Sequence, residues 1–133
     1  MLVTSYREKL EKLIDSGHID YVAMDIKNCP DKYGETVAIP DFDFEPVRKS
    51  VQILLQNKIQ YEFRTTVVKE FHTPQDMVKI GELIQGAEKY FLQHFIESEG
   101  NIKQGLTPLC REEMEKLRLS VLRFVKNAEL RGI

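Results

Sequence analysis

Charged and polar side chains interrupt three otherwise apolar segments of the chain. They are Asp25 and Lys27 in YVAMDIKN (21–28), Arg64 in IQYEFRTTVV (59–68), and Gln93 in KYFLQHF (89–95). A buried segment normally carries a charged group only when that group has a partner or a ligand. These residues are therefore the first candidates for a functional site.

Each of these segments has the pattern of a β-strand with one apolar and one polar face. In residues 20–26 the polar face carries Asp25 and ends at Lys27, and in residues 59–68 it carries Arg64. Ligands of α/β proteins bind at the carboxyl ends of parallel strands, so we expect these side chains to line a site there. The alternative is that Asp25 and Arg64 only neutralise each other as a buried ion pair.

Helical patterns alternate with the strand patterns along the whole chain. The expected helices are 5–16, 43–57, one that starts at Thr73, and 111–126; the expected strands are 20–26, 59–68, 89–95, and a short one in NAELRGI (127–133). Strands separated by amphipathic helices predict βαβ units with right-handed crossovers and a parallel sheet. The sequence therefore predicts one α/β domain, residues 1–133, with about four parallel strands and outer helices.

Local signals support several of these boundaries. Ser5 and Glu8 have the spacing of a capping box, and Thr73 followed by Pro74 is a strong helix start. Residues 28–42 are rich in turn formers, which predicts a long loop of the kind that often has a function.

Composition excludes several classes of protein. The formal net charge of −2 gives no basis for nucleic-acid binding, and the sequence contains neither a signal peptide nor an apolar run long enough to cross a membrane, so we expect a cytoplasmic protein. The two cysteines, Cys29 and Cys110, are far apart, and the histidines have no zinc-site spacing, so we expect free thiols and no metal site. No glycine-rich phosphate loop follows any strand.

Four segments resemble the second half of the glycyl-radical-enzyme activases, a family of the radical S-adenosylmethionine superfamily. They are YVAMDIKNCPDKYGE, YEFRTTVVKEFHT, AEKYFLQHF and the closing KNAELRGI. The similarity is greatest to the activating protein of anaerobic ribonucleoside-triphosphate reductase, with pyruvate formate-lyase activating enzyme as a relative. It covers residues 9–133, and the combination of DxK and RTT in this order is its most specific part.

The resemblance implies a fold and a chemistry. The family folds as a partial (β/α)6 barrel of the TIM type, and its active site holds a [4Fe–4S] cluster on a CxxxCxxC loop. The reduced cluster cleaves S-adenosylmethionine, and the resulting radical takes a hydrogen atom from a backbone glycine of the partner enzyme. These oxidoreductases therefore use two cofactors, S-adenosylmethionine and the cluster, and one protein partner, here the large subunit of anaerobic ribonucleotide reductase.

The resemblance also implies roles for individual residues. Asp25 and Lys27 match the DxK beside S-adenosylmethionine, where an acid and an ammonium suit a zwitterionic ligand. Arg64 matches an arginine near the substrate glycine. Gln93 or His94 matches a polar contact to the adenosyl end of the cofactor, although His94 could equally be an ordinary, partly buried histidine.

One departure from the family is large. The CxxxCxxC motif, the first strands and the glycine-rich segment that binds the methionyl amine are absent, and Cys29 and Cys110 cannot replace three converging thiolates. We therefore expect the chain to be the C-terminal half of a longer activase, with no catalytic residue and no metal ligand of its own, and to be inactive alone. An upstream CxxxCxxC in the reading frame would decide this question.

Two alternatives remain open at this point. The chain could instead be a non-catalytic α/β module that binds a small metabolite or a partner protein through the same polar rim; a hydrolase is less favoured because no nucleophile–base pair is visible.

Because strand 20–26 would lack a partner on one side, we expect a two-fold homodimer through that open edge. Alternatively, helix 5–16 covers the edge and keeps the chain monomeric.

Overall fold

A computed structural model describes residues 2–4, 10–96 and 105–133, and the side chains of residues 2–4 are not described. Its strands are β1 (Leu2–Thr4), β2 (Tyr21–Asp25), β3 (Gln60–Val67), β4 (Tyr90–His94) and β5 (Ala128–Arg131). Its helices are α1 (Leu10–Asp15), the 3-10 turn η1 (Pro30–Lys32), α2 (Tyr33–Val37), α3 (Glu45–Leu55), α4 (Pro74–Leu83) and α5 (Arg111–Val121).

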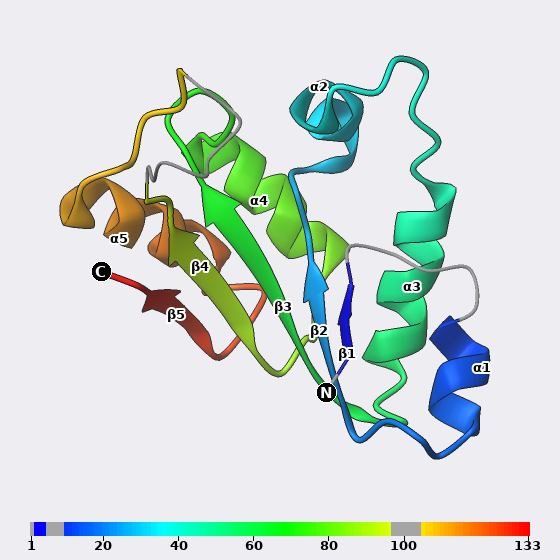
Figure 1. Cartoon of the computed structure of the whole chain (residues 1–133). Helices are drawn as coiled ribbons and strands as arrows, with labels where there is room; N and C mark the ends of the chain where they lie inside the picture. The colour runs from blue at the N-terminus through cyan, green and yellow to red at the C-terminus, as the bar shows by residue number, and fades with distance from the viewer. Residues whose placement is uncertain (1, 5–9, 97–104) are drawn as a thin grey trace.

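The strands form one parallel sheet in the order β1-β2-β3-β4-β5. Figure 1 shows them side by side in chain order, with α4 and α5 behind the sheet. Strands that follow one another without a change of direction give right-handed crossovers on one side, as in a segment of a (β/α) barrel. The predicted α/β fold with parallel strands and outer helices is confirmed.

The apolar core lies between the sheet and these helices. From the strands it contains Val22, Met24, Ile26, Tyr61, Phe63, Val67, Tyr90 and Leu92. From the helices it contains Leu10, Val47, Val51, Leu54, Met77, Ile80, Met114, Leu117 and Val121. The strand residues in this set alternate with those of the polar face, because neighbouring side chains of a strand point to opposite sides of the sheet. The second face therefore carries the polar residues, including those predicted to form the site.

Buried hydroxyl groups link three strands within this core. Tyr90 donates to Thr65 Oγ1 at 2.6 Å, and Thr65 donates to the carbonyl oxygen of Ile26 at 2.6 Å. Tyr90 is fully buried and Thr65 is nearly so. Every polar atom in this chain of bonds has a partner, so the hydroxyls connect β4, β3 and the end of β2 without the cost of an unpaired buried group.

The strongest predicted helix start is also confirmed. Thr73 precedes α4, with Pro74 in its first turn, and the Thr73 and Asp76 side chains each accept a hydrogen bond from the backbone of the other residue. This capping box satisfies two of the amide groups that every helix leaves unpaired at its start.

Two expectations about local structure were wrong or incomplete. Residues 28–42 are not one long loop, because η1 and α2 form within them. The helix expected at 5–16 is described only as α1, and the Ser5–Glu8 capping box lies outside the described residues. The turn formers of residues 28–42 were read as loop residues, although Pro30 suits the first turn of a helix.

The expected open edge at β2 was also wrong. β1 pairs with β2 in parallel, with Leu2 opposite Val22 and Thr4 opposite Met24. Three residues are too few to show an alternating pattern, which is why the sequence did not reveal this strand. The basis for a homodimer through the edge of β2 is therefore removed, and the edge is covered by a strand rather than by the first helix.

Candidate functional site

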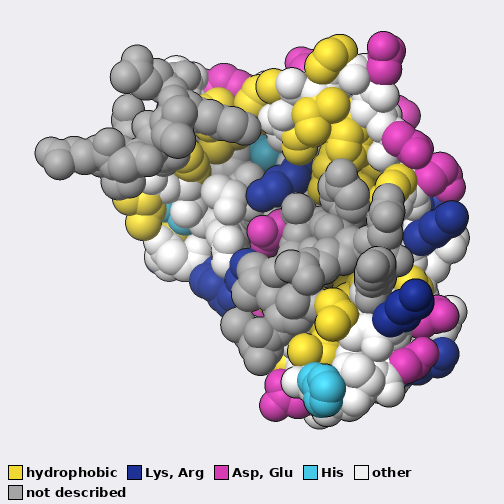
Figure 2. Space-filling view, turned by 45° about the vertical axis from the view of Figure 1, so that its right-hand side comes forward, with side chains coloured by type: hydrophobic (Ala, Val, Ile, Leu, Met, Phe, Trp, Pro, Cys, Tyr) yellow, Lys and Arg dark blue, Asp and Glu magenta, His cyan; other side chains and the backbone are white. Residues whose placement is uncertain are grey.

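A cavity of about 370 Å³ lies at the carboxyl ends of β2 and β3. It is lined by Asp25, Ile26, Lys27, Thr36, Val37, Arg64, Thr66, Val68, Phe71, His72, Phe95 and Leu106. Figure 2 shows a hollowed face on which basic, acidic and hydrophobic side chains meet. Its size is that of a site for a small ligand, and its position is where ligands of α/β proteins bind.

The cavity brings together the three charged residues predicted from the sequence. Asp25 and Arg64 are directly paired positions of β2 and β3, and Arg64 Nε donates to Asp25 Oδ1 at 2.5 Å. Lys27 Nζ lies 3.7 Å from the other carboxylate oxygen. The ion pair that formed the alternative interpretation therefore exists, but it lies on the wall of a cavity. Both side chains of the pair remain partly exposed, Asp25 at 28% and Arg64 at 19%, and the Lys27 side chain is 45% exposed.

Apolar side chains also contribute to the lining. Phe71 and Phe95 come from the segments that follow β3 and β4, Val37 comes from α2, and Leu106 comes from the segment before α5. A cavity lined by charged groups together with aromatic and aliphatic groups suits an amphipathic ligand that has a charged end and a planar or apolar end.

His72 and Asn28 also shape the rim of this cavity, and we did not predict either as a site residue. His72 is 5% exposed and its ring contacts the backbone of Lys27 and Val68. Asn28 is fully buried and donates to the Phe71 carbonyl at 2.8 Å and to Thr36 Oγ1 at 2.9 Å. The only sequence signal was position, because Asn28 and His72 lie in the segments that follow the predicted strands 20–26 and 59–68.

The structure separates the two candidates on β4. Gln93 pairs in register with Thr66, and Thr66 donates to Gln93 Oε1 at 3.3 Å, so Gln93 lies on the same face as Arg64. His94 pairs with Val67 of the core, and its Nε2 lies 3.0 Å from the Leu109 carbonyl oxygen. Only Gln93 therefore shares the polar face, while His94 lies on the side of the sheet that packs against the helices.

A second polar group, which joins β2, β3 and β5, lies on the same face of the sheet. Glu62 accepts from Tyr21 at 2.9 Å and from Arg131 at 3.1 Å, and the Arg131 guanidinium lies 3.7 Å above the Phe91 ring. Burial, and next the hydrogen bond to Glu62, raise the pKa of Tyr21 to about 12. Tyr21 therefore stays protonated and donates its hydrogen bond across the physiological pH range.

Behind the rim lies a buried carboxylate. Asp76 is 4% exposed and accepts from Lys32 Nζ at 2.9 Å, while Cys29 Sγ lies 3.8 Å from its other oxygen. Burial alone would raise the pKa of Asp76, but the bonds from Lys32 and Thr73 outweigh burial and lower it. Burial raises the pKa of the Cys29 thiol, so this cysteine is a poor thiolate ligand.

Within residues 2–4, 10–96 and 105–133, no three cysteine, histidine or acidic residues are grouped so that they could hold a metal ion. Cys29 is buried, Cys110 is exposed, and both are free thiols. The same residues contain no helix with the length and apolarity needed to cross a bilayer.

No protein-family model matches the sequence. The chain is 27% identical, over 97% of its length, to a protein of Methanocaldococcus jannaschii described as a "putative glycyl-radical enzyme activating enzyme". It spans 56% of that relative, which is little more than half of it. The fold matches a crystallised domain of pyruvate-formate lyase-activating enzyme from Bacteroides vulgatus with a TM-score of 0.74, at 12% identity, over 98% of this chain and 80% of that domain.

Proposed function

We propose that this chain is one part of a radical S-adenosylmethionine activase that introduces a glycyl radical into anaerobic ribonucleoside-triphosphate reductase. One observation carries the proposal: Asp25, Lys27 and Arg64 meet in a single cavity at the carboxyl ends of β2 and β3. The similarity to an activating enzyme, and the shared fold with an activase domain, support the same class of function.

The residues of the cavity fit S-adenosylmethionine. Lys27 is placed to pair with the carboxylate of the methionyl group, and Asp25 is placed to orient Lys27 or to accept from the methionyl ammonium. The aromatic and aliphatic side chains would cover the adenosyl group. Gln93 does not line the cavity itself, but it is bonded to the lining residue Thr66 and would extend the site along β4. When bound, this cofactor supplies the radical that removes a hydrogen atom from glycine.

Arg64 is placed to hold the peptide that carries the target glycine. Its guanidinium is fixed through Nε by Asp25, which orients the group toward the cavity. A fixed guanidinium suits peptide carbonyl oxygens, because its donors lie in one plane. The [4Fe–4S] cluster does not fit the described residues, which hold no set of three ligands, so its ligands must come from elsewhere in the activase.

The first test measures binding of S-adenosylmethionine to the chain by titration calorimetry. Lys27→Met should abolish binding, because the ammonium that pairs with the ligand carboxylate is lost. Lys49→Met is the matched control, because Lys49 is an exposed lysine on α3 that does not line the cavity. Equal binding by Lys27→Met and the wild-type chain would exclude this cavity as the cofactor site.

The second test identifies the partner. The product of the whole reading frame, reconstituted with iron and sulfide and reduced, should produce the electron paramagnetic resonance signal of a glycyl radical on anaerobic ribonucleotide reductase. Pyruvate formate-lyase is the control partner. A radical only on the control would replace the proposed partner, and a radical on neither would favour a non-catalytic module that binds a metabolite or a protein.

A further inference from the structure

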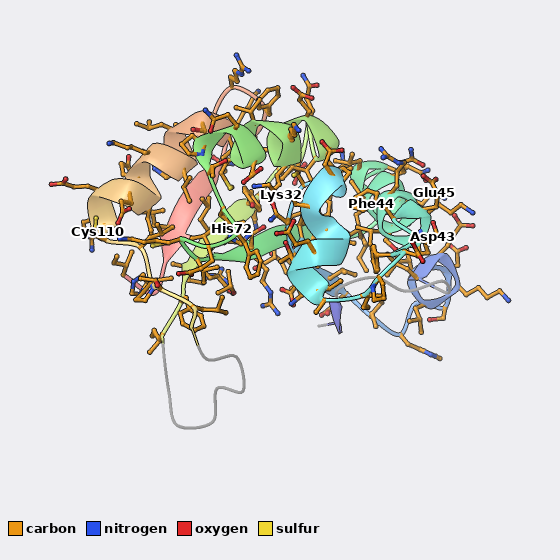
Figure 3. All side chains as sticks on the ribbon, turned by 90° about the horizontal axis from the view of Figure 1, so that it is seen from above. Lys32, Asp43, Phe44, Glu45, His72 and Cys110 are labelled. Carbon is orange, nitrogen blue, oxygen red and sulfur yellow. The ribbon has the colours of Figure 1, made fainter. Side chains whose placement is uncertain are left out.

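His72 lies where the ends of β2 and β3 meet. The ring Nδ1 accepts from the Val68 amide at 3.1 Å, and Nε2 lies 2.9 Å from the Lys27 carbonyl oxygen. Figure 3, viewed from above, shows His72 in the middle of the molecule near Lys32, with Cys110 toward one end. One buried side chain therefore bridges the two strand ends that carry the charged residues of the cavity.

These two contacts define the protonation state of the ring. The Val68 amide can only donate, so Nδ1 must be without hydrogen, and the Lys27 carbonyl can only accept, so Nε2 must carry one. The structure therefore requires a neutral imidazole in one of its two tautomers. Protonation would add a hydrogen to Nδ1 and place it against the amide hydrogen of Val68.

The two contacts of His72 hold Lys27 in place, because β2 ends at Asp25 and its ladder does not reach Lys27. The described ladder of β2 ends at Asp25, and the next bond to β3 runs from the Ile26 amide to the Arg64 carbonyl at 2.8 Å. The Lys27 carbonyl lies beyond this bond and is held by His72. A second bond, from Asn28 to the Phe71 carbonyl, joins the same two segments.

We propose that neutral His72 is the positioning residue of the cavity, which holds Lys27 against Asp25, and that its protonation in acid releases Lys27 and weakens ligand binding. His72 does not touch the ligand in this proposal; it acts through the Lys27 backbone. Only the ligand-binding part rests on the proposed function. The link between His72 protonation and the position of Lys27 stands on the contacts of the ring alone.

The groups around His72 have opposite effects on the pKa of its ring. Burial is the largest influence and lowers the pKa of His72, Asp76 on α4 favours the charged ring, and Lys32 on η1 opposes it. Lys27, Asp25 and Arg64 share the cavity with the ring. Because the folded pKa lies below the ordinary value of about 6.5, the neutral ring is secured above that value and is lost as pH falls through the folded pKa.

The test is nuclear magnetic resonance of the 15N-labelled chain over a pH series. The His72 ring should be the Nε2–H tautomer at neutral pH, and the amide signals of Lys27 and Val68 should titrate together with it, at a pKa below the ordinary histidine value of about 6.5. An Nδ1–H tautomer, or amide signals that do not follow the ring, would overturn the proposal.

Two variants separate positioning from packing. His72→Gln keeps an amide that can donate to Lys27 and accept from Val68 but cannot titrate, so it should abolish the pH response of both amides. His72→Phe keeps the bulk and removes both bonds, so the Lys27 signal should be displaced at every pH. His18→Gln is the control and should leave the titration unchanged. If His72→Phe does not fold, the wild-type titration and His72→Gln still decide.

Binding of S-adenosylmethionine provides the last readout. Below the pKa of His72, the apparent affinity of the wild-type chain should fall about tenfold per pH unit, because only the neutral fraction binds. The affinity of His72→Gln should stay level over the same range, and a parallel fall in both proteins would contradict the proposal. If neither protein binds at any pH, the proposed function fails while the amide titration still tests the role of His72.

Discussion

Arg64 and Asp25 face each other on directly paired positions of β3 and β2, with Nε 2.5 Å from Oδ1. Lys27 approaches the second carboxylate oxygen at 3.7 Å. One carboxylate is thus shared between two cations on a cavity wall. The structural role of these residues and the binding role that we propose for them can be measured separately.

Replacing Arg64 with methionine should lower the free energy of unfolding by about 1 kcal/mol. The value is modest because the Arg64 and Asp25 side chains are 19% and 28% exposed, so water screens part of their attraction. Urea unfolding of the wild-type chain and of Arg64→Met measures this change in the free energy of unfolding. Lys79→Met breaks the far more exposed pair with Asp31 and should change stability little. An effect of Arg64→Met as small as that of Lys79→Met would show that the Asp25 pair adds nothing to folding.

The two capping boxes should differ in strength. Asp76→Ala should lower the free energy of unfolding by about 2 kcal/mol, because it removes the α4 cap together with a buried carboxylate that accepts hydrogen bonds from Thr73 and Lys32. Glu113→Ala removes the corresponding acceptor from the capping box of Cys110 and Glu113 at the start of α5, and it should cost clearly less because the Glu113 side chain is 39% exposed. Thermal unfolding of both variants measures the two losses of stability. Equal losses would contradict the idea that the burial of Asp76 makes its capping box the stronger one.

The pH dependence of the same carboxylate gives a second readout. The folded pKa of Asp76 is lowered, so its contribution is complete above the ordinary value of about 3.9 and is lost as pH falls through the folded pKa. The stability difference between wild type and Asp76→Asn should therefore be constant near neutrality and shrink in acid. A stability difference that grows in acid would show that folding raises the pKa of Asp76 instead of lowering it.

Gly81→Ala should destabilise the chain although alanine is the better helix former. A Cβ atom at this buried position of α4 would collide with the Phe124 ring, lying 3.0 Å from Cγ and in still closer contact with Cδ2. We expect a loss of about 1–3 kcal/mol, typical of overpacking. The double variant with Phe124→Leu should recover part of it, and no recovery would place the strain elsewhere.

Anaerobic reconstitution of the chain with iron and sulfide should give no stoichiometric iron–sulfur cluster. The buried thiol of Cys29 and the exposed thiol of Cys110 are not grouped with a third ligand in the described residues. Iron and sulfide analysis, with absorbance in the charge-transfer region, measures the outcome. Uptake of one cluster per chain together with cleavage of S-adenosylmethionine would overturn the proposal that cluster ligands come from elsewhere.

Much of the sheet was predictable because its strands alternate strictly. The polar face was predicted at Asp25 and Arg64, and the structure pairs the two directly. Asp25 lies between Met24 and Ile26 of the core, and Arg64 follows Phe63 of the core. The α4 start was predictable because Thr73 and Pro74 act through the backbone next to them. Patterns of this kind depend only on neighbours in the sequence.

The parts that were missed depend on distant contacts or on very short segments. β1 has three residues, and η1 and α2 are short helices among turn formers, so no periodic signal could develop. His72 was missed because its importance lies in the Lys27 carbonyl, far away in the sequence. The choice between Gln93 and His94 required the register of β4 against β3.

The chain of buried hydroxyls from Tyr90 through Thr65 to Ile26 has a consequence for strand alignment. A strand that slides by two residues keeps its apolar and polar faces, so hydrophobic burial alone does not prevent such a slide. Here a slide of β3 against either neighbour would separate hydroxyl groups from their acceptors inside an apolar layer and leave them unpaired. The hydroxyl groups thus fix the register of the strands. Arg64 directly precedes Thr65, so this register keeps Arg64 opposite Asp25.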